Sequence, residues 1–311
     1  MAIFNKKKNL KVRDSFGDRC LQAFTTTVLV LVLLIIGYPL IFCISCSFSS
    51  PFALSNAKVW LWPVDFSLGG YEFILHYKLI WNGYKNTIFY TVTNVSLTLC
   101  FIILMAYPLS RPYYQGKSFI QKVMLVAMLT GAGLVPSFLM RVWFKMNNTI
   151  WAVIISGLTP INHIFIMRTS FKTSVPADLL DAAKIDGASD FMCLTKIAVP
   201  LAKATVSVLI LYNAVGMWNS YFGAMIYLSS QPDLWPLQLV LRNILISATS
   251  IDGIEDGGQG ASSGQLAAQE KSSIEQIRYA VIVVGTVPCL VMYMITQKFF
   301  EKGVMIGSVK G

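Results

Sequence analysis

Charged side chains are scarce in this sequence. Only 13% of the 311 residues are charged and His occurs twice, whereas 55% are hydrophobic and the mean hydropathy is +0.61. Soluble globular domains carry about 25% charged residues, so the composition excludes that class of protein. We therefore expect an integral membrane protein.

Motifs for phosphate binding and metal binding are also lacking. The nearest match to a phosphate-binding loop is 116–118, but Arg111 occupies the position of its first Gly. Cys43 and Cys46 form a lone C-x-x-C inside an apolar run, where packing is a better explanation than redox or metal chemistry. We expect no disulfide, no metal and no cofactor bound by this chain. ATP hydrolysis would then require a separate protein.

Ionisable residues are nearly absent from the apolar segments. An ion-coupled secondary transporter of a small polar solute is an alternative class, but it typically places charged residues near the membrane midplane. His163 is the only ionisable residue well inside a predicted span, and we expect it to be a hydrogen-bonded structural residue. A membrane enzyme would need a convergent set of acids and bases, and the acids of this chain lie outside the spans.

Long apolar runs dominate the rest of the chain and predict an all-α fold with six transmembrane helices. A bilayer crossing needs about 20 apolar residues. The expected spans are approximately 21–48, 86–109, 118–142, 150–167, 200–228 and 279–300, within a membrane domain covering 21–300. A basic tail, 1–20, precedes the spans and a short tail, 301–311, follows them. The first run is too long for a signal peptide.

Lys and Arg are distributed unequally between the two sides of these spans. The side that holds both termini has 17 of the 25 basic residues, and the other side has 8. Positively charged loops stay in the cytoplasm. We therefore expect both termini to be cytoplasmic, together with the polar segment between the fourth and fifth spans. The largest outer loop, 229–278, contains a possible short amphipathic helix at 237–246.

The polar segment 181–200 lies between two of these apolar runs. Good helix formers occupy 177–185, Gly187 is placed to break the helix, and a second helical pattern follows at 188–197. Pro200 stands where the next helix can start. The sequence predicts an elbow of two short helices, with a coupling loop at 177–197.

The spacing of this segment resembles a known motif. It contains Asp181, Ala182, Ala183, Gly187, Ile197, Val199 and Pro200. This pattern is similar to the EAA loop in the membrane subunits of binding-protein-dependent ABC importers, with Asp in place of the usual Glu and Val in place of Leu. The resemblance implies a type I importer permease fold, whose loop is a cytoplasmic coupling helix docked on an ATPase subunit. An amphipathic helix resting on the membrane surface is the alternative.

The resemblance also implies partners and a location. These are a second, homologous permease in a heterodimer, two cytoplasmic ATPase subunits that hold ATP and Mg²⁺, and an extracytoplasmic solute-binding protein, in a bacterial cell membrane. No nucleic acid is expected, because the basic residues gather at the ends of the apolar runs. The expected coupling residues are Leu179, Leu180, Asp181, Ala182, Ala183, Ile185, Asp186, Gly187, Phe191, Met192, Ile197 and Pro200.

The tail 302–311 and the layout from residue 84 onward are similar to one branch of carbohydrate permeases, alongside the smaller membrane subunit of the maltose system. This likeness implies an oligosaccharide cargo, including complex or acidic oligosaccharides. Amide and aromatic side chains suit sugar rings. The candidate pathway residues are Asn94, Asn213, Trp218, Asn219 and Tyr221. Packing between helices, with Asn hydrogen-bonding across them, is the alternative for each.

Overall fold

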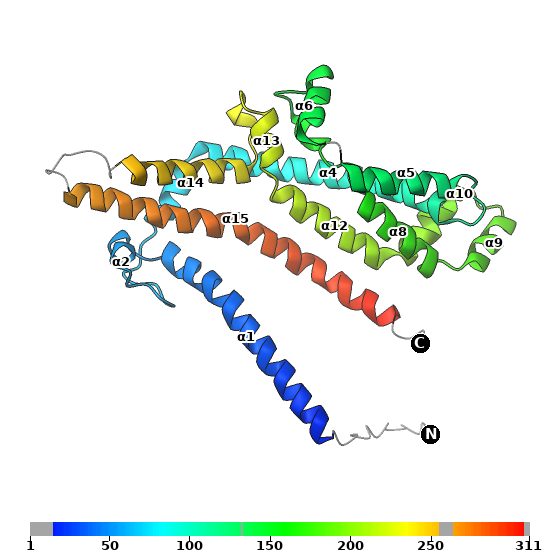
Figure 1. Ribbon diagram of the computed structural model, residues 1–311, viewed down its shortest axis with the longest axis horizontal. Coiled ribbons are helices and arrows are strands. Elements are labelled where there is room, and N and C mark those ends of the chain that lie inside the picture. The colour runs from blue at the N-terminus through cyan, green and yellow to red at the C-terminus, as the bar shows by residue number, and fades with distance from the viewer. Residues whose placement is uncertain (1–14, 132, 255–263, 308–311) are drawn as a thin grey trace, which may run out of the picture.

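The protein is built mainly from long helices. The computed structural model describes residues 15–131, 133–254 and 264–307. The described residues are helical, apart from connecting segments and one isolated antiparallel bridge between Ser49 and Phe66. The molecule is elongated, and α4 and α15 extend along much of its length (Figure 1). The expectation of an all-α protein is confirmed.

Three helices are long and apolar enough to cross a membrane. They are α1 (Phe16–Ser47), α4 (Lys78–Ser110) and the segment Ser273–Ile295 of α15 (Gly264–Gly307). The most apolar window of α1 buries none of its residues within the chain, and most of this helix stands apart from the other helices (Figure 1). Its exposed apolar surface therefore has to be covered by lipid or by another chain.

Two further apolar segments, 117–143 and 190–218, are each a pair of helices that meet at a sharp bend. Helices α5 (Lys117–Thr130) and α6 (Leu134–Trp143) meet at 109°, where Gly131 and Gly133 adopt positive φ angles of 54° and 72°. Backbone of this kind is open to glycine and strained for other residues. With each bent pair taken as one span, the described chain has up to five candidate spans.

The expected fourth span, 150–167, is not one helix. The structure has α7 (Ile150–Ile154) and then α8 (Ile161–Ser174). Gly157 lies between them at φ +76°, and Pro160 caps the start of α8. A left-handed Gly and a Pro interrupt the helix within this short apolar segment.

The fifth expected span, 200–228, does not begin at Pro200. This residue lies within α11 (Val199–Leu201), and α12 (Lys203–Trp218) starts after it with an 82° bend. Helix α13 (Phe222–Tyr227) follows. The expected loop 229–278 contains the turn η2 (Pro232–Leu234) and an 18-residue helix, α14 (Leu237–Ile254), which is longer than the helix expected at 237–246. The middle of the expected loop, 255–263, lies outside the described residues.

Buried side chains form separate clusters at the two ends of the bundle. The cluster at the end that carries the elbow, which we call the inner cluster, joins α4, α5, α8, the elbow and α12 around Tyr107, Phe171 and Leu209. The outer clusters join α4, α12, α14 and α15 around Ile80 and Trp218, and α4, α7, α13 and α14 around Tyr90. Short helices α2 (Pro51–Ser55) and α3 (Gly69–His76) pack beside α15. The elbow belongs to the inner end.

Candidate functional site

The elbow between α8 and α12 consists of two helical segments that meet at Gly187. Helix α9 (Ala177–Ile185) ends where Gly187 adopts φ +84°. The amide of Gly187 donates to the Lys184 carbonyl at 3.0 Å, and the amide of Ala188 donates to the Ala183 carbonyl at 2.9 Å. These two bonds form a Schellman motif, which fixes the direction in which the chain leaves α9.

The second segment begins with a side-chain cap and ends with an unusual turn. The Ser189 hydroxyl accepts a hydrogen bond from the Met192 amide at 3.2 Å at the start of α10 (Asp190–Met192). The chain continues through a π-helical segment, η1 (Cys193–Ala198), before Pro200. Pro200 has no amide hydrogen for a bond to the carbonyl of Lys196, which is consistent with a wider turn at this point.

One side of the elbow is anchored in the inner cluster. Leu180, Cys193 and Leu194 are buried there, and Ile197 is half-buried against the same residues. Leu180 is only 3% exposed, so its predicted contact with a partner is incompatible with this conformation. Its position on the inward side of α9 instead makes it an internal packing residue.

Four apolar side chains of the elbow are exposed. Phe191 is 68% exposed and Ile185 is 87% exposed, and Leu179 and Met192 are also open. We call these four residues the exposed elbow set. Asp181, Ala182, Asp186 and Gly187 are exposed on the same elbow, whereas Ala183 is half-buried and Pro200 is exposed at its end. Solvent-exposed apolar groups on a polar elbow are typical of a surface that contacts another protein.

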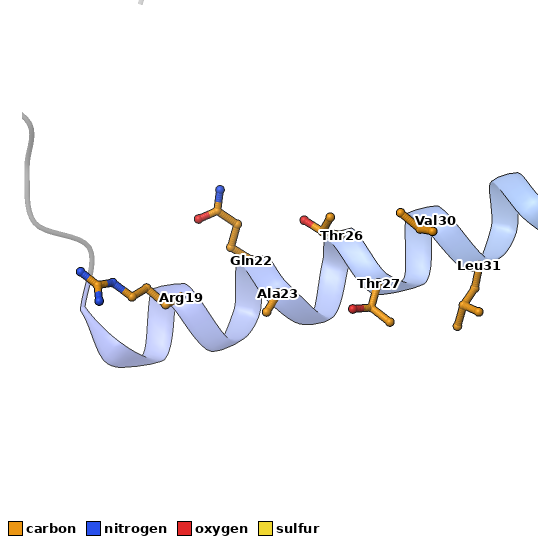
Figure 2. Close-up of a pocket in the computed structure, with 7 residues that line it drawn as sticks. All are labelled: Arg19, Gln22, Ala23, Thr26, Thr27, Val30 and Leu31. Atoms are coloured by element: carbon orange, nitrogen blue, oxygen red, sulfur yellow. The ribbon is translucent and has the colours of Figure 1, made fainter.

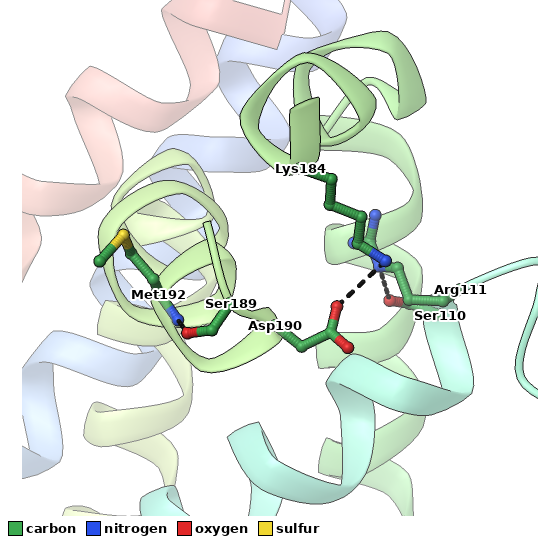
Figure 3. A network of polar contacts seen from close by, with 6 residues as sticks. All are labelled: Ser110, Arg111, Lys184, Ser189, Asp190 and Met192. Carbon is green, nitrogen blue, oxygen red and sulfur yellow. Dashed lines mark hydrogen bonds and ion pairs between the residues drawn. The ribbon is translucent and has the colours of Figure 1, made fainter. Parts of the chain in front are cut away.

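A polar network holds the two halves of the elbow together (Figure 3). The Lys184 ammonium lies 3.1 Å from an Asp190 carboxylate oxygen and forms an ion pair with it. The same ammonium lies 4.1 Å from the ring centre of Tyr113, in the loop between α4 and α5. Hydrogen bonds to Tyr113 and Asp190 raise the pKa of Lys184, so its charge persists at neutral pH. The network therefore connects α9, α10 and the α4–α5 loop.

A buried arginine joins two of the helices whose side chains pack with the elbow in the inner cluster. Arg111 is 4% exposed, and its guanidinium lies 4.9 Å from the ring centre of Tyr107. It donates to the Ser110 hydroxyl at 3.0 Å and to the Phe171 carbonyl at 3.3 Å. These contacts join the end of α4 to α8. The elbow residues Leu180, Cys193 and Leu194 are buried in the same cluster as Tyr107 and Phe171.

Three of the predicted pathway residues take part in packing between or within helices. Asn94 donates hydrogen bonds from α4 to the carbonyls of Ile154 at 2.6 Å and Ser156 at 3.2 Å. Asn213 donates to the Leu209 carbonyl of its own helix at 2.7 Å. Trp218 is buried, with its indole N–H directed at the Gly285 carbonyl 3.3 Å away. The geometry of these three residues fits the packing alternative. His163 likewise packs flat against a ring, that of Tyr212.

The remaining two pathway residues share a pocket of about 510 Å³ between α12, α14 and α15. Asn219 and Tyr221 line it together with Gln238 and Arg242 from α14 and Thr286 from α15. The Asn219 carbonyl oxygen accepts a hydrogen bond from the Gln238 amide at 3.4 Å. The Arg242 guanidinium lies 5.4 Å from the ring centre of Tyr221. Leu241, Leu245, Val281 and Ile282 give it an apolar wall as well. We call this hollow the polar pocket, after the polar side chains that line it. Its volume lies in the range of small-molecule sites.

A second hollow, of about 580 Å³, has a different character. Figure 2 shows that its labelled residues, from Arg19 to Leu31, all belong to the beginning of α1. A single helix contributes one wall only, so this chain alone does not enclose a ligand there. We therefore exclude it as a solute site.

Sequence reasoning did not find several residues of these two sites. Lys184, Asp190 and Tyr113 were missed because their contacts join segments that are distant or separated by a turn. Gln238 and Arg242 were missed because they lie in a stretch expected to be an outer loop. One signal was available: Arg242 is a charged residue within the apolar stretch 237–246.

The comparisons with known proteins bear on the whole chain. No family model matches it. The protein LplC of Bacillus subtilis (strain 168) is 31% identical over 312 aligned positions, which cover all of both chains. The polygalacturonan/rhamnogalacturonan transport system permease protein YtcP of the same organism is 32% identical, over 91% of this chain and 96% of that protein.

A solved structure is similar throughout. The crystal structure of a bacterial ABC transporter involved in the import of the acidic polysaccharide alginate contains a chain with a TM-score of 0.80 and 32% identity. The match covers 92% of this chain and 99% of that one. Fold and sequence agree over nearly the full length, and the resemblance drawn from the elbow is confirmed at the level of the family. The chain belongs to the family of sugar ABC importer permeases, the membrane-spanning subunits of binding-protein-dependent transporters.

Proposed function

We propose that this chain crosses a bacterial cell membrane six times and forms half of an oligosaccharide pathway with a second, homologous permease. Its elbow seats on one of two cytoplasmic ATPase subunits, and an extracytoplasmic binding protein delivers the solute. The observation that carries the proposal is the exposed elbow set, held on a rigid turn at the inner end of the bundle. The excess of Lys and Arg on the same side of the spans supports a cytoplasmic elbow.

The packing of the elbow gives it the properties of a lever. Leu180 and Leu194 connect it to the inner cluster, which includes Phe171 of α8 and Leu209 of α12. The Lys184–Asp190 pair resists separation of its two halves. A displacement imposed on the exposed elbow set by ATPase closure is therefore transmitted to α4, α8 and α12 as a rigid-body movement. Such a movement alternates access between the two sides of the membrane.

The proposed cargo is an oligosaccharide that carries acidic groups. One relative is a permease of a polygalacturonan and rhamnogalacturonan system, and the similar solved structure comes from an importer of acidic alginate. The polar pocket, with amide, aromatic and cationic groups, supports a hydroxyl-rich solute.

The coupling role is tested with Ile185→Ser in the complete importer reconstituted in proteoliposomes. We expect loss of ATP-driven uptake with an unchanged unfolding temperature, because Ile185 is 87% exposed and its side chain is not part of the buried core. Leu201→Ser is the matched control, since Leu201 is an exposed apolar residue just beyond the elbow. Full uptake by Ile185→Ser, or uptake in liposomes that lack the ATPase subunits, contradicts the proposal.

A further inference from the structure

The polar pocket contains a cation that the described residues leave without a counter-ion. Arg242 projects from α14 into the pocket, and its lining contains no Asp or Glu. Among the residues that the structure describes, its guanidinium contacts the Tyr221 ring and has neither an ion-pair partner nor a hydrogen-bond acceptor. A guanidinium carries five N–H donors, and at this half-exposed position they are open to acceptor groups of a ligand.

The surroundings of Arg242 are fixed by close helix packing. Gly285 of α15 lies against α14 so closely that a Cβ on it would be 2.9 Å from the Leu241 side chain. The carbonyl of Gly285 also faces the indole N–H of Trp218 on α12. Helices α12, α14 and α15, which line the pocket, therefore all meet at Gly285. Arg242 is the residue after Leu241 on α14. The cation is presented by a rigid scaffold.

The other groups of the pocket suit a sugar ring. Tyr221 offers an aromatic face and is 38% exposed. Asn219 and Gln238 are hydrogen-bonded to each other, and each amide retains further donor or acceptor capacity for hydroxyl groups. Thr286 and Cys289 complete the polar lining from α15. Amides, one aromatic ring and one unpaired guanidinium together favour a hydroxyl-rich ligand that carries an anion.

We propose that the polar pocket binds a sugar acid, with Arg242 contacting its carboxylate and Tyr221, Asn219 and Gln238 contacting the ring. A planar guanidinium binds a carboxylate through two parallel N–H···O bonds, which a neutral sugar does not form. Arg242 thus selects acidic over neutral units in the pathway. The inference rests on the proposed function and adds the site in this chain that recognises the acidic group and the residue that binds it.

The experiment measures binding to the complete importer, without its binding protein, in phosphatidylcholine nanodiscs. The probes are tetragalacturonate and its carboxyl-reduced, neutral counterpart, and the lipid has no net charge that would compete for Arg242. The wild type should prefer the acidic probe by about tenfold or more, because charge-assisted hydrogen bonds are strong. Arg242→Gln should remove the preference and leave affinity for the neutral probe unchanged. Lys145→Gln, which removes an exposed charge elsewhere in the chain, should retain it.

Four outcomes overturn the inference. A wild type without preference shows that the pocket does not recognise the carboxylate. Equal weakening of both probes by Arg242→Gln shows that Arg242 acts in folding or in contact with the second permease. ATP-driven uptake is measured with the same proteins in proteoliposomes, with the binding protein added. It shows whether a negative result concerns only this inference or the proposed function as well. Uptake that persists without selectivity refutes this inference alone, whereas absence of ATP-driven uptake in the wild type refutes both.

Discussion

The conformation of Gly187 decides how the two halves of the elbow meet. Its φ of +84° lies in the left-handed region, and the space around its Cα is open. A substitution therefore acts through backbone strain and not through a clash. Gly187→Ala should cost roughly 1–2 kcal/mol at this turn.

We expect Gly187→Ala to reduce the solute transported per ATP hydrolysed more than it lowers the unfolding temperature, because strain at the turn reorients the exposed elbow set. Gly187→Asn is the matched control, since Asn tolerates the left-handed region better than Ala. Coupled uptake and ATPase assays on both variants provide the measurement. If Ala and Asn have equal effects on coupling, the backbone explanation is wrong.

Asn94 was expected in the pathway, yet its amide bridges α4 to the carbonyls of Ile154 and Ser156. Asn94→Ala leaves these carbonyls without their donor and should destabilise the protein by about 1–3 kcal/mol. Ser96→Ala, two residues away at an exposed position, should be nearly neutral. Thermal unfolding in detergent compares the two variants. If Asn94→Ala is as stable as the wild type but loses uptake, then Asn94 acts in the solute pathway and not in helix packing.

For single residues, backbone conformation could be predicted from the sequence better than side-chain contacts could. The Gly187 turn was predictable because glycine has a distinctive conformational range. The inward side of Leu180 was not, because the motif gives spacing along the chain and not which face packs on α4 and α8. The contact between Lys184 and Tyr113 joins segments 71 positions apart, and no local pattern indicates it.

Among the elements, the segment from η1 to α12 determines how the elbow joins the bundle. Its chain passes through a π-helical turn, reaches Pro200 and bends by 82°. Pro200→Ala restores an amide hydrogen that can bond to the Lys196 carbonyl and favours a regular α-helix there.

We therefore expect Pro200→Ala to retain or raise thermal stability while it lowers ATP-coupled uptake, because the elbow is rotated relative to α12. Pro176→Ala, at the cap of α9, is the control for loss of a proline at the same inner end. Uptake and unfolding temperature are measured for both proteins. Normal coupling in Pro200→Ala would show that this turn does not set the orientation of the elbow.

The long elements were predicted better than the interrupted ones. Helices α1 and α4 follow directly from continuous apolar runs. In the segment 150–167, Pro160 was expected as a breaker, whereas the left-handed turn at Gly157 that separates α7 from α8 was not. Helix α14 was taken mainly as loop because Arg242 and its polar neighbours dilute the apolar signal. Its buried Leu237, Leu239 and Val240 depend on the tertiary contacts with α4 and α15.

At the scale of the whole molecule, the exposed apolar surfaces imply an assembly. Helix α1 buries almost none of its apolar surface within the chain, and the exposed elbow set lies at the inner end. Membrane lipid or a second permease would cover the apolar surface of α1, and a soluble subunit would cover the exposed elbow set. The membrane class and the importer family were predictable from composition and one motif. The six crossings and the partners remain predictions.

Labelling of Ile185→Cys with a membrane-impermeant thiol reagent tests the central claim most directly. The signal is measured above that of the parent protein, whose native Cys20 and Cys100 are exposed. We predict labelling in inverted membrane vesicles and none in intact cells, with protection when the ATPase subunits are bound. Labelling from outside intact cells, or labelling in vesicles that the ATPase subunits leave unchanged, would contradict the assignment of the elbow as the cytoplasmic contact with the ATPase.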